Sequence, residues 1–256
     1  ELQALLQQNP LLLLGEKHDN PDHHQLRLSL LDSLLSAAGP SLIVMEMMQR
    51  GQQPRIAALA DSTLDTDLSA LAERLAWDDE GWPWQFYGPA VALALQRGAS
   101  LVAGNIDSSE VMTIYRDTRA TMTQRLDAQQ LAQLHLDIDS SHCGMLPAEQ
   151  FPAMVRVQQA RDQQMAAALM SGADAFARRI LLAGNYHIRH DLGVPNYLDA
   201  QTPPLSVAFL EVDPALDDPV DYLQQFSDTA AYDVVWFSPA LRQDDYCAEM
   251  RATQDP

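Results

Sequence analysis

The sequence is short of cysteine, and this limits the metal centres and covalent cross-links that it can form. Its two cysteines, Cys143 and Cys247, lie far apart in the chain. They lack the paired spacing of a cysteine-based zinc site and are too few for a disulfide framework. One disulfide in an oxidising compartment and two free thiols are both compatible with the sequence.

Basic residues are also scarce. Sixteen Lys and Arg residues oppose 35 Asp and Glu residues, which gives a formal net charge of −19, and Lys17 is the only lysine. Nucleic-acid binding requires a basic surface that displaces counterions from phosphates, and electrostatic adhesion to anionic lipid requires a similar surface. The composition argues against both functions, so we expect no nucleic-acid partner.

Long apolar runs are absent, since no segment is apolar over the roughly 20 residues that a membrane-spanning helix needs. The sequence instead contains short apolar runs separated by segments with helical periodicity. Six runs have the length of buried strands, and they cover residues 11–15, 41–46, 101–106, 180–183, 205–212 and 233–237. Strands that alternate with helices predict an α/β fold, with a mainly parallel central sheet flanked by helices. We predict a single domain over residues 1–256, with a helical insertion or lid at 110–172.

The stretch 11–27, LLLLGEKHDNPDHHQLR, concentrates much of the chemistry. Glu16, Lys17 and His18 follow an apolar run that ends in a glycine, and a turn with N-cap residues and a proline then starts a helix. His23 and His24 lie near the start of that helix. Ligands bind at the carboxyl ends of strands in open α/β sheets. We therefore expect this stretch to border a binding site.

Polar side chains also follow other predicted strands. Glu46 ends the second run, Asn105 and Asp107 follow the third, and His187 follows the fourth in ILLAGNYH. If the strands are parallel, these side chains gather with Glu16 and His18 at one edge of the sheet. Such a set can perform acid–base chemistry or bind a divalent metal. We predict Glu16, His18, Glu46 and His187 as catalytic residues or metal ligands; the alternative is that each makes only a structural hydrogen bond or ion pair.

Three further features allow more than one interpretation. The aromatic cluster at 77–87 either packs on the core or forms the wall of a flat apolar site. His187 and His190 have the spacing of one helical face, which is a weak indication of a metal site. Asp162 and Arg161 lie in the middle of a predicted helix, and we expect Asp162 to face solvent unless that helix covers the site.

Several of these motifs, taken together and in order, resemble the ChaN family of haem-binding bacterial lipoproteins. The resemblance is carried by GEKHDNPDHHQLR, SLIVMEM, SHCGMLP, QARDQQMA, GNYHIRHDLGVPNYL and YDVVWFSP, and it extends over nearly the whole chain. The ChaN family belongs to a wider group that includes the Tiki proteases and the erythromycin esterases. These relatives share the GExH strand end and the later GxxH motif.

The resemblance implies an exported protein with a role in haem or iron uptake. It implies a location on the periplasmic side of the cell envelope, at the outer membrane, through a lipid on an upstream cysteine that is not in this sequence. The enzyme relatives imply that Glu16, His18, Glu46 and His187 match catalytic or metal-site positions. A hydrolase of the esterase or peptidase kind, with or without a divalent metal, is therefore the alternative to a haem-binding protein.

Haem sets requirements that the sequence can be checked against. Ferric iron accepts histidine or tyrosinate, the macrocycle favours flat apolar walls, and the propionates favour cations. Under the resemblance, the residues expected to bind haem are Lys17, His23, His24, Arg27, Tyr186, Arg189 and Tyr197. A half-site on one subunit would leave one haem face in water, so we expect a homodimer that encloses haem between its subunits.

Overall fold

The computed structural model describes residues 2–60, 67–117, 125–199, 201–213 and 231–241, together with 215, 218, 220–222, 247, 248 and 251. Its centre is a six-stranded sheet in the order β3-β2-β4-β1-β5-β6, in which every adjacent pair is parallel. The strands are β1 (Leu11–Leu14), β2 (Ser41–Gln49), β3 (Ser100–Asn105), β4 (Arg178–Leu182), β5 (Leu205–Val212) and β6 (Val234–Pro239). The predicted α/β class with a parallel sheet is confirmed.

Helices connect the strands, as the alternating pattern predicts. They are α1 (Leu2–Gln8), α2 (Pro21–Leu35), α3 (Gln53–Ala60), α4 (Leu68–Leu75), α5 (Trp84–Gln96), α6 (Ser108–Arg116), α7 (Ala128–Ser141) and α8 (Phe151–Met170). The turn chemistry before α2 acts as expected, because the Asn20 side chain accepts hydrogen bonds from the backbone N–H groups of Asp22 and His23. Helix α5 begins at Trp84, so part of the aromatic cluster at 77–87 is helical.

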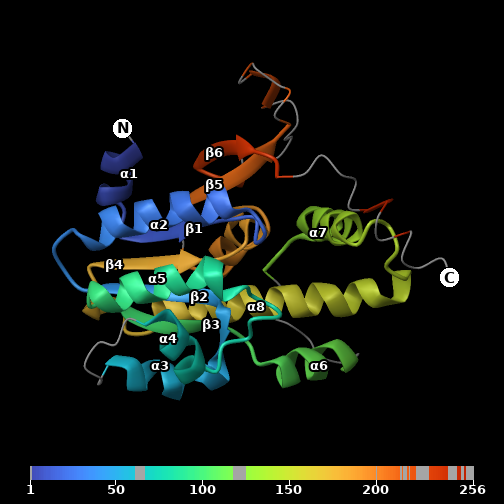
Figure 1. Cartoon of the computed structure of the whole chain (residues 1–256). Coiled ribbons are helices and arrows are strands. Elements are labelled where there is room, and N and C mark those ends of the chain that lie inside the picture. The colour runs from blue at the N-terminus through green and yellow to red at the C-terminus, as the bar shows by residue number, and fades with distance from the viewer. Residues whose placement is uncertain are drawn as a thin grey trace.

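Two apolar layers cover the two faces of the sheet. Leu12 and Leu14 of β1 face a layer that includes α2 and α5, while Leu11 and Leu13 face a layer that includes the second half of α8. Figure 1 shows α2 and α5 in front of the central strands. Strands that are covered on both faces need apolar side chains at every position, which explains why β1 is four consecutive leucines.

Helix α7 and the first half of α8 extend beyond the sheet. They pack on each other through a separate apolar cluster that contains Leu134 and Ile138 of α7, Val155 of α8 and Leu192 from the loop after β4. Figure 1 shows α7 past the carboxyl ends of the strands, with α8 running from it back under the sheet. These two helices therefore form a wall opposite the polar strand ends.

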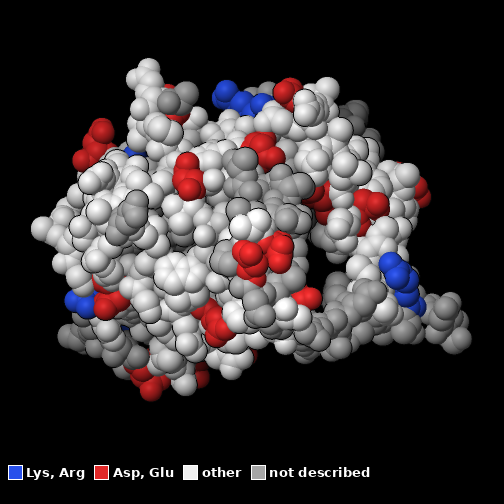
Figure 2. Space-filling view, turned by 90° about the horizontal axis from the view of Figure 1, so that it is seen from above, with Lys and Arg blue, Asp and Glu red and all other residues white. Residues whose placement is uncertain are grey.

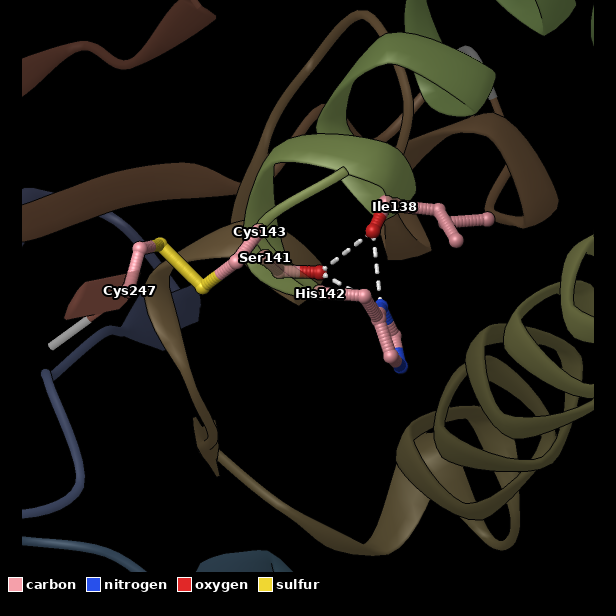
Figure 3. The surroundings of a disulfide bond; sticks show 5 residues. All are labelled: Ile138, Ser141, His142, Cys143 and Cys247. Atoms are coloured by element: carbon pink, nitrogen blue, oxygen red, sulfur yellow. Dashed lines mark hydrogen bonds between the residues drawn. A yellow bond between two sulfur atoms is a disulfide. The ribbon is translucent and has the colours of Figure 1, made fainter. Parts of the chain in front are cut away.

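A disulfide joins this wall to the C-terminal part of the chain. Cys143, just after α7, is bonded to Cys247, with 5.3 Å between their Cα atoms and a sequence separation of 104. Figure 3 shows it beside the end of α7, where Ser141 Oγ and His142 Nδ1 both lie within hydrogen-bond distance of the Ile138 carbonyl oxygen. Of the two states compatible with the sequence, the structure has the disulfide.

The surface reflects the composition. Figure 2 shows acidic side chains spread over the face seen there, with few basic ones. In the part of the chain that the structure describes, no helix has the length and apolar character needed to cross a membrane.

Candidate functional site

A cavity of about 760 Å³ lies at the carboxyl edge of the sheet. The strand ends form one side of it, and α7 and α8 form the other. Its apolar lining includes Trp82, Leu134, Ile138, Leu192 and Phe209. Its polar lining includes Glu16, Lys17, His18, Glu46, Gln158, Arg161, Tyr186 and His187. All four residues predicted as catalytic or metal ligands therefore border one cavity, as the parallel topology requires.

Glu16 is the centre of the first polar cluster in this cavity. Its buried carboxylate forms an ion pair with Arg27, accepts a hydrogen bond from Tyr87 Oη at 2.7 Å, and lies 2.8 Å from His18 Nδ1. Burial alone would raise the pKa of Glu16, but Arg27 and the histidines outweigh burial and hold that pKa below its ordinary value. The first cluster is thus a buried carboxylate held ionised by a buried guanidinium.

His187 is the centre of the second cluster. Its Nε2 lies 3.2 Å from Glu46 Oε1, and its Nδ1 lies 2.6 Å from Asp162 Oδ1. Burial alone would lower the pKa of His187, but the two carboxylates raise it to about 10. Glu46 also accepts a hydrogen bond from the Gly184 backbone N–H at 2.8 Å, and His187 holds the pKa of Glu46 well below its usual range. Near neutral pH this cluster is an imidazolium between two acidic groups.

His18 connects the two clusters to the cavity. Its side chain is 44% exposed and lies edge-on against Trp82, with ring centroids 4.7 Å apart. Burial opposes its charge, but Glu16 and Glu46 raise its pKa above the ordinary value. The site therefore presents the His18 imidazole and the apolar surface of Trp82 to the cavity.

Comparison with known proteins identifies the family. The model of the family described as haem-binding uptake, Tiki superfamily, ChaN matches residues 2–198. The chain belongs to the ChaN family. No curated protein matches the chain. Among solved structures it is similar to ChaN of Campylobacter jejuni, which is described as binding haem cofacially, with 22% identity and a TM-score of 0.72 over 84% of this chain and 86% of that one.

Two other solved structures share the fold at lower similarity. The type III effector HopBA1 is 14% identical, with a TM-score of 0.51 over 93% of this chain and 91% of that one. A mutant erythromycin esterase in its open conformation is 16% identical, with a TM-score of 0.51 over 83% of this chain and 72% of that one. The resemblance to the ChaN family of the Tiki superfamily is thereby confirmed, and the erythromycin esterase shares the fold.

Most residues expected to bind haem have structural partners in this ChaN-family fold. Arg27 is paired with Glu16, as described above. Arg189 is buried and forms ion pairs with Asp137 and Asp191. Tyr197 packs in the apolar layer that contains the second half of α8. None of these three side chains borders the cavity.

The two histidines at the start of α2 also make contacts within the protein. His23 Nδ1 accepts a hydrogen bond from the Lys17 backbone N–H at 2.9 Å, and burial lowers the pKa of His23 to about 4. The His24 ring stacks on Phe86 at 4.6 Å, and its Nε2 lies 2.9 Å from the His18 carbonyl oxygen. Neither imidazole borders the cavity. Burial also lowers the pKa of His24.

Lys17 and Tyr186 do reach the cavity. Lys17 lies at its rim, where Nζ is 2.7 Å from Glu211 Oε2. Tyr186 is 53% exposed. Of the seven residues expected to bind haem, these two are therefore the ones in a position to contact a ligand in this cavity.

Arg161 and Asp162, in the middle of α8, lie at the site, where Arg161 borders the cavity and Asp162 contacts His187. Asp162 was expected to face solvent unless its helix covers the site, and this exception applies, because Asp162 is 1% exposed and contacts His187. The physical reason is that α8 crosses the strand ends, so the middle of this helix faces the site. A polar run at 158–164 inside an otherwise apolar helix was the available signal. His187 and His190 do not form a pair, because His190 Nε2 contacts Asp233 instead.

A metal site is not formed by the predicted ligands. Among the described residues, no group of three or more His, Cys, Asp or Glu side chains could hold a metal ion. Glu16 forms an ion pair with Arg27, and Glu46 forms an ion pair with His187. The fold brings the strand ends together as predicted, but the charged side chains there are neutralised by ion pairs within the protein.

The His187 cluster gives the protein a predicted pH dependence of stability. His187 has a pKa of about 10 when folded and an ordinary value of 6.5 when unfolded, so the folded state retains a proton that the unfolded state loses. Its contribution is complete below about pH 6.5 and is lost as the pH rises through about 10. The free energy of unfolding should therefore fall by about 1.4 kcal/mol per pH unit within this window.

Urea titrations at several pH values measure this slope. His187→Gln should remove most of it, and His190→Gln, outside the cavity, should keep it. An unchanged slope in His187→Gln would show that His187 is not the group responsible.

Proposed function

We propose that this protein binds haem in the cavity at the carboxyl edge of the sheet. The observation that carries the proposal is the cavity of about 760 Å³ in a chain that belongs to a haem-binding family. Trp82, Leu134, Ile138 and Phe209 supply the apolar and aromatic surface that a macrocycle favours. Haem, once bound, would supply the iron centre; the chain's own residues supply a ligand, apolar walls and cations.

The tyrosines near the site differ in their ability to reach iron. Tyr87 is buried and donates its hydroxyl hydrogen to Glu16, and burial together with Glu16 raises its pKa far above the ordinary value. Burial and Asp162 also raise the pKa of Tyr197. Both side chains therefore resist becoming tyrosinate, whereas the exposed Tyr186 borders the cavity. We assign Tyr186 as the iron ligand.

The cellular setting belongs to the same proposal. The Cys143–Cys247 disulfide supports an oxidising compartment, which agrees with export to the periplasmic side of the cell envelope. The family description supports a role in haem or iron uptake. An exposed iron ligand at the rim of an open cavity supports a homodimer that covers the outer haem face. A lipid anchor upstream of this sequence completes the proposed arrangement.

Titration of the apo-protein with haemin tests the proposal. We expect a saturable change in the Soret band at one haemin per chain, accompanied by a doubling of the 28.4 kDa mass if haem is enclosed between two copies. A linear, non-saturating change in absorbance would contradict haem binding. Saturation without a change in mass would contradict only the dimer.

Hydrolysis remains the second candidate function. It is favoured by the two carboxylate–imidazole clusters that border the cavity, because such pairs can hold and transfer protons. A metal-free mechanism suits these clusters better than a metal-dependent one, since their acidic groups are already neutralised by Arg27 and His187. A panel of ester and peptide substrates tests this function. Cleavage of any of them by the wild type and not by Glu46→Gln would support hydrolysis. If the wild type leaves every substrate intact, the result counts against it.

A further inference from the structure

Arg161 is the arginine that lines the cavity among the described residues. It borders the cavity from α8, and its Nε is buried without a hydrogen-bond partner among the described residues. Arg27 and Arg189 are both paired with carboxylates. Arg156, five residues earlier on the same helix, donates a hydrogen bond to the Pro152 carbonyl oxygen at 3.0 Å. Arg161 is thus a cation at the ligand cavity whose buried Nε–H has no acceptor among the described residues.

A buried, charged N–H donor destabilises the folded state unless another group accepts its hydrogen bond. A buried donor without an acceptor costs about 1–3 kcal/mol, and more if the donor is charged. The adjacent acid cannot take this role easily, because Asp162 already contacts His187 Nδ1 at 2.6 Å. The missing acceptor is therefore to be sought in whatever occupies the cavity.

The chemistry of a guanidinium defines that acceptor. Its planar set of donors matches the two oxygens of a carboxylate, and charge-assisted hydrogen bonds of this kind are about twice as strong as neutral ones. The surroundings also favour a carboxylate on the ligand rather than on the protein: the chain carries a net charge of −19, and Lys17 at the rim is already paired with Glu211. An anionic ligand would find few other cations at this edge.

We propose that Arg161 binds a carboxylate of the ligand, which for haem is a propionate. This inference rests on the proposed function and goes beyond it, because it identifies the residue that distinguishes a porphyrin with free carboxylates from one without them. The apolar walls would then hold the macrocycle, and Arg161 would fix its orientation.

Haemin and haemin dimethyl ester, titrated in the same detergent, test this role. The two probes share the iron and the macrocycle, but the ester lacks anionic carboxylates. We expect the wild type to bind haemin about tenfold or more tightly than the ester, and Arg161→Gln to bind both with similar affinity. Arg161→Lys, which keeps the charge but not the planar donors, should keep part of the preference. Arg156→Gln, on the same helix but outside the cavity, should keep all of it.

The outcomes separate this inference from the proposed function. If the wild type binds haemin and its ester equally, or if Arg161→Gln keeps the full preference, Arg161 does not bind a propionate and haem binding still stands. If neither probe binds the wild type saturably, the proposed function itself fails. The comparison of the two probes on the wild type requires no substitution, so it is informative even if Arg161→Gln does not fold.

Discussion

Replacing Arg27 with leucine is expected to lower the free energy of unfolding by about 3–5 kcal/mol. The reason is that Arg27 is 2% exposed and forms an ion pair with Glu16, which is 1% exposed. Removing the guanidinium leaves a carboxylate in the interior with only Tyr87 and the histidines to stabilise its charge. Urea denaturation followed by circular dichroism measures the loss.

A double variant separates the ion pair from the loss of packing. Adding Glu16→Gln to Arg27→Leu removes the unpaired charge but keeps a side chain that can accept the hydrogen bond from Tyr87 Oη. We expect the double variant to recover a large part of the lost stability. A single variant as stable as the wild type would show that the buried pair does not hold this part of the fold.

Replacing Tyr186 with phenylalanine is expected to weaken haemin binding by at least about 100-fold. Substitutions of groups that only support a metal ligand commonly cost 10- to 100-fold, and loss of the ligand itself should cost more. The phenyl ring preserves the apolar contact, so the change isolates the phenolate oxygen. Titration with haemin, monitored at the Soret band and at the phenolate-to-iron charge-transfer band, measures affinity and ligation together.

Tyr232→Phe is the matched control for this experiment. Tyr232 lines the same cavity, and its hydroxyl oxygen lies 3.4 Å from the Asn185 carbonyl oxygen. We expect this variant to retain both the affinity and the charge-transfer band. If Tyr186→Phe retains them as well, the iron ligand is another residue and the assignment of Tyr186 is wrong.

The sequence contains enough information to predict the sheet and one side of the site. Continuous apolar runs identify strands that are buried on both faces, and parallel strands bring their carboxyl ends to one edge. Glu16, His18, Glu46 and His187 could be placed together for this reason, although they are distant in sequence. The start of α2 could also be predicted from the sequence, because the N-cap Asn20 and the helix-starting Pro21 act through contacts with neighbouring residues.

The other side of the site depends on tertiary packing that no local pattern encodes. Whether Asp162 faces solvent or His187 is decided by where α8 crosses the sheet, and that crossing is fixed by contacts with α7 and with the strands. The same limit applies to the predicted haem-binding cations. Arg27 and Arg189 looked suitable in sequence, but their buried carboxylate partners come from other elements of the fold.

The location of iron in crystals of the haemin-loaded protein tests the central claim most directly. An anomalous difference map recorded at the iron absorption edge should show one strong peak per chain, in the cavity between the strand ends and α7, at bonding distance from Tyr186 Oη. A peak outside this cavity, or one bound by a residue from another part of the surface, would contradict the account.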